Sequence, residues 1–176
     1  MLGWADADLV RRMQKGWRGG LADGTPCGGG STIASTAAIC AALPALVARY
    51  GIASICDAGA GDQHWIGRVD WPVNYRGFDL VPRKTGVTQI DICETALPAC
   101  DAVLCRHVLI HLDPERIRKA LTLFRKSATF LLASQYDNAP AFDAGNQFNP
   151  TDLRPLLGEP IERIADTGSD LALWQL

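Results

Sequence analysis

Four polar residues each follow a short apolar run, and together they could bind a ligand. Asp57, Asp79, Asp91 and Arg106 stand at the ends of segments whose composition is typical of buried β-strands. In a parallel sheet the carboxyl ends of the strands share one edge, and ligands of α/β proteins bind in the crevice there. The sequence therefore predicts that these four side chains converge on one site.

A glycine turn after the first of these strands limits the kinds of ligand that the site could bind. Residues 57–62 read D-A-G-A-G-D, and a glycine lets the backbone approach a ligand where a Cβ would collide. Asp79 is placed to accept hydrogen bonds from both hydroxyls of a ribose. The third glycine of the dinucleotide fingerprint G-x-G-x-x-G is missing, and Asp62 would repel a pyrophosphate. A nucleoside with a cationic tail suits these acids, and S-adenosylmethionine is such a molecule.

The elements that must hold these residues alternate between strand and helix patterns. This alternation predicts an α/β fold, a Rossmann-like and mostly parallel sheet with a C-terminal antiparallel hairpin. Helices are expected over 6–18, over 32–50 with a kink or restart at Pro44, from 62–66, and over 113–126 with Asp113 as the N-cap. Strands are expected at 54–57, 74–80, 87–92, 101–105, 129–134, 160–165 and 171–176.

The chain of 176 residues suits one main domain. Residues 1–31 are expected to form an N-terminal helix and a glycine-rich lid or connector, and residues 32–176 the Rossmann-like domain. Residues 81–86 are too few for a crossover helix between parallel strands. Loops or a partner chain should then cover this side of the sheet, which makes a homodimer plausible.

Composition excludes several classes of protein. Apolar residues make up 48% and charged residues 20% of the chain, and no apolar run approaches the roughly 18 residues of a membrane span. These features predict a cytoplasmic protein without a membrane partner. The six cysteines have no CxxC spacing and His107 and His111 lack the glutamate of an HExxH motif, so no metal site is expected.

The motifs and their order resemble the class I S-adenosylmethionine-dependent methyltransferases. The resemblance covers about residues 30–176 and is carried by D-A-G-A-G-D at 57–62, G-F-D-L at 77–80, D-I at 91–92 and C-R-H-V-L-I-H-L at 105–112. With G-G-G-S-T at 28–32, the chain is also similar to small bacterial and phage methyltransferases.

This resemblance implies a role for each site residue. The alternative to a cofactor-binding role is that Gly59 and Gly61 are needed only for the turn and that Asp79 caps a neighbouring helix. Because Asp79 is expected at a solvent-facing strand end, its replacement by alanine should leave the fold intact. The implied cofactor contacts are Gly59, Ala60 and Gly61 through their backbone, Asp57 and Arg106 at the methionine end, Asp79 and Leu80 at the ribose, and Asp91 with the Ile92 amide at adenine.

The methyl acceptor is the least determined part of the site. His107 is the first candidate for a catalytic base, since imidazole titrates near neutrality, with a structural role as the alternative; His111 and Tyr136 are weaker candidates. The place of the N/D-P-P-Y/F motif of amino methyltransferases reads C-R-H-V, so a small molecule, a sugar or a modified nucleotide is favoured over nucleic acid. A non-catalytic or lyase-type adenosyl-ligand protein and a nicotinamide enzyme remain alternatives.

Overall fold

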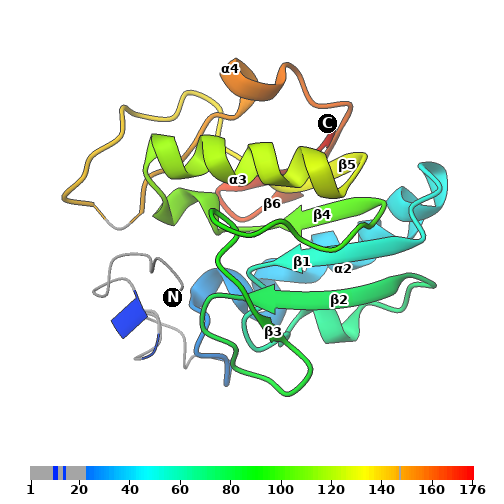
Figure 1. Cartoon of the computed structure of the whole chain (residues 1–176). Coiled ribbons are helices and arrows are strands. Elements are labelled where there is room, and N and C mark those ends of the chain that lie inside the picture. The colour runs from blue at the N-terminus through cyan, green and yellow to red at the C-terminus, as the bar shows by residue number, and fades with distance from the viewer. Residues whose placement is uncertain (1–9, 12–13, 15–22, 147) are drawn as a thin grey trace.

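Seven strands form one sheet in the order β3-β2-β1-β4-β5-β7-β6 (Figure 1). The computed structural model describes residues 10–11, 14, 23–146 and 148–176. Strands β1 to β5 pair in parallel, whereas β7 runs antiparallel to both β5 and β6, which confirms the predicted mostly parallel sheet with a C-terminal hairpin. The strands are β1 (Ser54–Ala58), β2 (Asn74–Asp79), β3 (Thr88–Gln89), β4 (Ala102–Cys105), β5 (Phe130–Gln135), β6 (Glu162–Asp166) and β7 (Ser169–Gln175).

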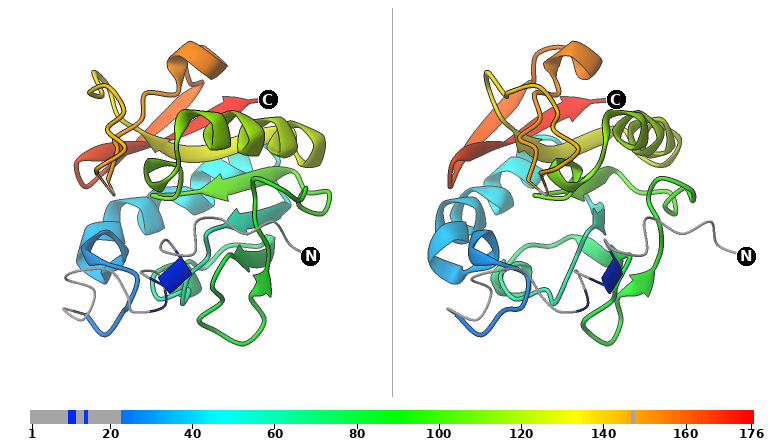
Figure 2. Two further views of the ribbon diagram at one scale, coloured as in Figure 1. Left: turned by 60° about the vertical axis from the view of Figure 1, so that its left-hand side comes forward. Right: turned by 90° about the vertical axis from the view of Figure 1, so that its left-hand side faces the viewer.

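Two long helices cover opposite faces of this sheet (Figure 2). Helix α2 (Ile33–Arg49) begins at Thr32, whose side chain accepts a hydrogen bond from the backbone N–H of Ser35, and it runs through Pro44 without a restart. Helix α3 (Pro114–Ser127) has Asp113 as its N-cap, as predicted. Short helices lie at η1 (Gly29–Ser31), η2 (Ile66–Arg68), η3 (Leu109–His111) and α4 (Arg154–Leu157).

The alternation of side chains along β4 shows how the two cores are divided. Ala102 and Leu104 pack in the apolar cluster of α2, and Val103 and Cys105 pack in the cluster of α3. All four residues are almost completely inaccessible to solvent. A strand covered on both faces is apolar throughout, and this pattern made the central strands recognisable in the sequence.

Two predicted elements differ from the structure. Residues 62–65 form no helix, and the predicted helix is reduced to the short 3-10 helix η2, which begins at Ile66. Gly61 and Gln63 have positive φ angles of 55° and 57°, which interrupt any helical start. The third strand is confined to Thr88–Gln89, because it pairs with β2 through two residues only. Asp91 therefore lies in a turn beyond the strand.

The connection that follows β2 was expected to be too short for a crossover helix, and the structure shows what covers the sheet in its place. Residues 80–87, all of which are described, form bends and turns without a helix. Ile92, Cys93 and Leu97 from the following loop pack with Phe78 in the apolar cluster of α3. Loops of this chain thus cover the sheet here, and the homodimer stays a prediction.

The predicted helix over 6–18 lies mostly outside the described residues, as does the first part of the predicted lid. In the parts of the chain that the structure describes, no helix has the length and hydropathy of a membrane span.

Candidate functional site

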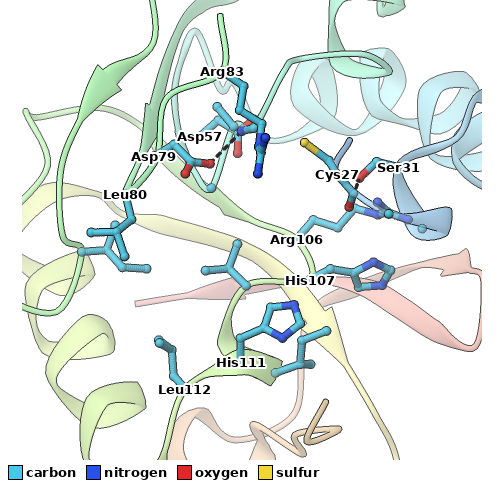
Figure 3. A pocket seen from close by; sticks show the side chains of 18 of the residues that line it. Cys27, Ser31, Asp57, Asp79, Leu80, Arg83, Arg106, His107, His111 and Leu112 are labelled. Atoms are coloured by element: carbon cyan, nitrogen blue, oxygen red, sulfur yellow. Dashed lines mark hydrogen bonds between the residues drawn. The ribbon is translucent and has the colours of Figure 1, made fainter. Parts of the chain in front are cut away.

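A cavity of about 280 Å³ lies at the carboxyl ends of β1, β2 and β4. This volume is just below the roughly 300–1,000 Å³ of small-molecule sites. Figure 3 shows the acids of β1 and β2 on one side of the cavity, and two histidines that follow β4 on the other. Every residue that the sequence assigned to the site lines it: Asp57, Gly59, Ala60, Gly61, Asp79, Leu80, Asp91, Ile92, Arg106 and His107.

The glycine turn is held by the neighbouring strand and packed from two sides. The carbonyl of Phe78 accepts hydrogen bonds from Gly59 and Ala60. Gly59 has a φ of 108°, and a Cβ there would meet Val108 at 2.1 Å; a Cβ on Gly61 would lie 2.6 Å from the Cys27 sulfur. These glycines are therefore required by protein packing, in addition to any approach of a ligand.

Asp79 braces the same turn. Its carboxylate accepts hydrogen bonds from the backbone N–H groups of Gly61 and Val81, both at 2.8 Å. Burial raises its pKa, and these backbone bonds oppose the shift. Because Asp79 is 6% exposed, the expectation that it faces solvent is wrong. Its two bonds to backbone N–H groups argue against the expectation that its removal would leave the fold unaffected.

Asp57 is enclosed beside it. The Tyr75 hydroxyl donates a hydrogen bond of 2.6 Å to one oxygen of the Asp57 carboxylate. Burial raises the pKa of Asp57 to about 7, the Tyr75 bond acts in the opposite direction, and the charge of Asp79 raises it further. Two acids thus face one cavity, where they would attract a cationic group.

At the β3 side, Asp91 is engaged by protein groups. Arg116 of α3 donates from Nη2 to both carboxylate oxygens, at 3.1 and 2.9 Å, and the backbone N–H of Cys93 donates to one of them. Among the described residues, none accepts a hydrogen bond from the N–H of Ile92, which stands at the start of the turn. The sequence analysis did not include Arg116 among the site residues, because its distance from Asp91 along the chain gives no sign of this contact.

Arg106 is bound by an acid that sequence reasoning did not include. Its Nε and Nη2 donate to the two oxygens of Asp166, both at 2.8 Å, and its guanidinium lies 5.4 Å from the centre of a Trp65 ring. The side chains of Arg106 and Asp166 are 4% and 0% exposed. This pair joins the end of β4 to the tip of the C-terminal hairpin, and no local sequence signal connects residues so far apart.

His107 lies at the opposite end of the cavity, in a left-handed backbone conformation with φ 54°. Its N–H donates to Ser134 Oγ, and its Nε2 is 3.4 Å from both Ser169 Oγ and Asp166 Oδ2. Burial and then the charge of Arg106 lower its pKa to about 4, against the charge of Asp166. The ring is therefore neutral at pH 7.

The side of the cavity that holds the two histidines also carries apolar and aromatic groups. His111, Ile110, Leu112 and Phe148 line the cavity there. Tyr136, the other candidate for catalysis, is buried behind this wall, with its ring 6.4 Å from that of His107. Among the described residues, no group of three histidine, cysteine or acidic side chains is arranged to hold a metal ion.

The described part of the glycine-rich segment closes one wall of the cavity. Cys27, Gly28, Gly30 and Ser31 all line it. Asp23 accepts a hydrogen bond of 2.6 Å from the N–H of Ile33 and lies 3.3 Å from His64 Nε2. The loop is thus packed against the glycine turn, and its movement as a lid stays a prediction.

Comparison with known structures places this geometry in context. No model of a known protein family matches the chain, and no curated protein sequence matches it. The magnesium protoporphyrin IX methyltransferase ChlM from Synechocystis PCC 6803, solved with bound S-adenosylmethionine, is similar with a TM-score of 0.63 and 14% identity over 99% of this chain and 98% of that one. The chain has the class I S-adenosylmethionine-dependent methyltransferase fold.

Two further structures share this methyltransferase fold. The pyocyanin biosynthetic protein PhzM matches with a TM-score of 0.60 and 11% identity, over 80% of this chain and 55% of that one. The methyltransferase domain of bacterial CtHen1 matches with a TM-score of 0.57 and 14% identity, over 78% of this chain and 97% of that one.

Proposed function

We propose that the protein transfers a methyl group from S-adenosylmethionine to a small-molecule acceptor. The observation that carries this proposal is the convergence of the sequence-assigned residues on one cavity at the carboxyl edge of a methyltransferase fold. ChlM is named for its small-molecule substrate and PhzM for the biosynthesis of a small molecule, which favours an acceptor of this class over nucleic acid.

The hydrogen-bond donors and acceptors that line the cavity match the polar groups of the cofactor. An ionised carboxylate offers about four acceptor positions, and the two backbone bonds to Asp79 leave the others for the ribose hydroxyls. The N–H of Ile92, which has no acceptor in the described parts of the chain, can donate to a ring nitrogen of adenine. Asp57 supplies an acceptor for the amino group of the methionine moiety. Asp91 would act less directly than the sequence suggested, by fixing the loop through Arg116.

The cofactor supplies an electrophilic methyl group, and the protein must orient the acceptor and exclude water. We assign His107 to the acceptor side, where its neutral imidazole can accept a hydrogen bond from a hydroxyl or amine. An imidazole with a pKa of about 4 is a weak base. His107 would therefore orient the acceptor and take its proton late, as positive charge builds on the attacking atom.

Calorimetric titration of the purified protein with S-adenosylmethionine and with S-adenosylhomocysteine tests the proposal. Both ligands are expected to bind at one site. Mass spectrometry of acceptor mixtures should then show products heavier by one methyl group, together with S-adenosylhomocysteine. Absence of binding by both ligands would refute the proposal, and cofactor turnover without a methylated product would refute the transfer step.

A further inference from the structure

Arg83 carries a cationic donor that the contacts described above leave unused. It lies in the loop of residues 80–87, between β2 and β3, and its side chain lines the cavity. Figure 3 shows this side chain extending towards the space between the two acids and Arg106. Its Nη2 atom is buried, and none of the described residues accepts a hydrogen bond from it.

An unpaired guanidinium N–H in a buried place is costly. Arginine stays charged at all accessible pH values, so the group cannot avoid this cost by losing its proton. Asp79 is close enough for the charge of Arg83 to lower its pKa, but the recorded bonds of Asp79 go to Gly61 and Val81. An anionic group in the cavity could accept a charge-assisted hydrogen bond from this donor.

The charges on the other walls of the cavity restrict which anion can enter it and which arginine can bind that anion. Asp57, Asp62 and Asp79 all line the cavity and would repel a carboxylate that approached without a cation. Arg106 offers little compensation, because Asp166 already occupies its Nε and Nη2. Arg116 donates from Nη2 to Asp91, and although its Nε is also buried without an acceptor among the described residues, its charge is already paired with that carboxylate. Arg83 is therefore the arginine best placed to accept a new anionic partner.

We propose that Arg83 binds the carboxylate of the methionine moiety of the cofactor and thereby selects the intact amino acid tail. This inference rests on the proposed function, because it needs an adenosyl ligand in the cavity. S-adenosylmethionine has one anionic group, its carboxylate, and Arg83 would neutralise it beside Asp57, which takes the amino group. Arg83 would thus take the role at the methionine end that the resemblance implied for Arg106.

Decarboxylated S-adenosylmethionine separates this contact from the rest of the ligand, since it keeps the adenosine, the sulfonium and the amino group. Calorimetry on the wild-type protein should show S-adenosylmethionine binding about 10- to 100-fold more tightly than the decarboxylated form, as expected for loss of a charge-assisted hydrogen bond. In Arg83→Met the two ligands should bind with nearly equal affinity. Arg83→Lys, which keeps the charge, should retain part of the preference.

Lys84→Met is the matched control, because Lys84 is the exposed basic neighbour in the same loop; its ligand preference should equal that of the wild type. Equal affinities of the two ligands for the wild type would overturn the inference while leaving the proposed function standing. A full preference retained in Arg83→Met would overturn it as well. Failure of both ligands to bind the wild type would instead refute the proposed function, and this inference with it.

Discussion

Asp57 is almost completely enclosed, and its charge is therefore unfavourable in the folded protein without ligand. Its folded-state pKa of about 7 lies above the usual aspartate pKa of 3.8, so between these pH values the folded state holds a proton that the unfolded state releases. The free energy of unfolding should then fall as the pH rises from about 4 to about 7, and the loss should be complete above that range.

Asp57→Asn removes this penalty while keeping an acceptor for the Tyr75 hydroxyl. We expect the variant to be more stable than the wild type by about 2–4 kcal/mol at pH 8 and nearly equal to it at pH 4. Urea unfolding across this pH range measures the difference, and the same variant should bind S-adenosylmethionine more weakly. Parallel pH profiles of the two proteins would contradict the assignment.

Asp79 combines a structural and a ligand-binding role, which two substitutions can separate. Asp79→Ala leaves the N–H groups of Gly61 and Val81 without their acceptor and should cost about 2–4 kcal/mol of stability. Asp79→Asn retains one carbonyl acceptor, so it should lose less stability but still at least about tenfold in affinity for the cofactor. Urea unfolding and calorimetry give the two quantities. A stable Asp79→Ala variant with unchanged affinity would exclude both roles.

For individual residues, the sequence predicted correctly which side chains surround the cavity. It was a poorer guide to the contacts that each side chain makes. Asp57, Asp79 and His107 were found because strand ends meet at one edge of a parallel sheet. The partners Asp166 and Arg116 were missed, since their pairing depends on the tertiary path of the chain. The tight contact of Gly59 with Val108 was equally beyond reach, because a turn motif does not reveal what packs against it.

The β6–β7 hairpin is the element that fixes the end of β4. The ion pair between Arg106 and Asp166 lies at its tip and is almost fully buried. Asp166→Asn would leave the guanidinium charge uncompensated and should destabilise the protein by about 3–5 kcal/mol. Thermal or urea unfolding measures this loss.

Asp170→Asn in the same hairpin is the control, because its ion pair with Arg163 is about one-third exposed. Exposed pairs contribute about 1 kcal/mol or less. Equal effects of the two substitutions would mean that the Arg106 pair has no special structural role.

Elements with strong periodicity or caps were predicted correctly, and those fixed by local backbone geometry were not. Helix α3 follows from Asp113, Pro114 and its apolar stripe. The helix after the glycine turn is reduced to the short η2 because Gln63 has a positive φ, which the sequence does not signal. The shortening of β3 reflects an edge strand whose two residues are both exposed and bury no side chain against the core.

For the whole molecule, the division into a segment of residues 1–31 and a domain of residues 32–176 stays a prediction, as do the closing lid and the cytoplasmic location. The described end of that segment makes close contacts with the domain. Thr25 is fully buried. Gly30 lies so close to His107 that a Cβ added to this glycine would be 2.7 Å from Nδ1 of the imidazole. A ligand can therefore leave or enter more easily if this loop moves away.

The sulfur of Cys27 fills the place beside Gly61 where a side chain would otherwise point, and it also forms part of the cavity wall. Burial raises the pKa of this thiol to about 11, so at pH 8 only about one molecule in a thousand holds the reactive thiolate. Alkylation by iodoacetamide should be slow for this reason, and slower still, by about tenfold, with S-adenosylhomocysteine bound. Cys40, which is partly exposed on α2 and does not line the cavity, provides an internal reference. The labelling rate of Cys27 would then report how often the loop moves away from the cavity. An equal labelling rate with and without S-adenosylhomocysteine would contradict this link between ligand binding and loop opening.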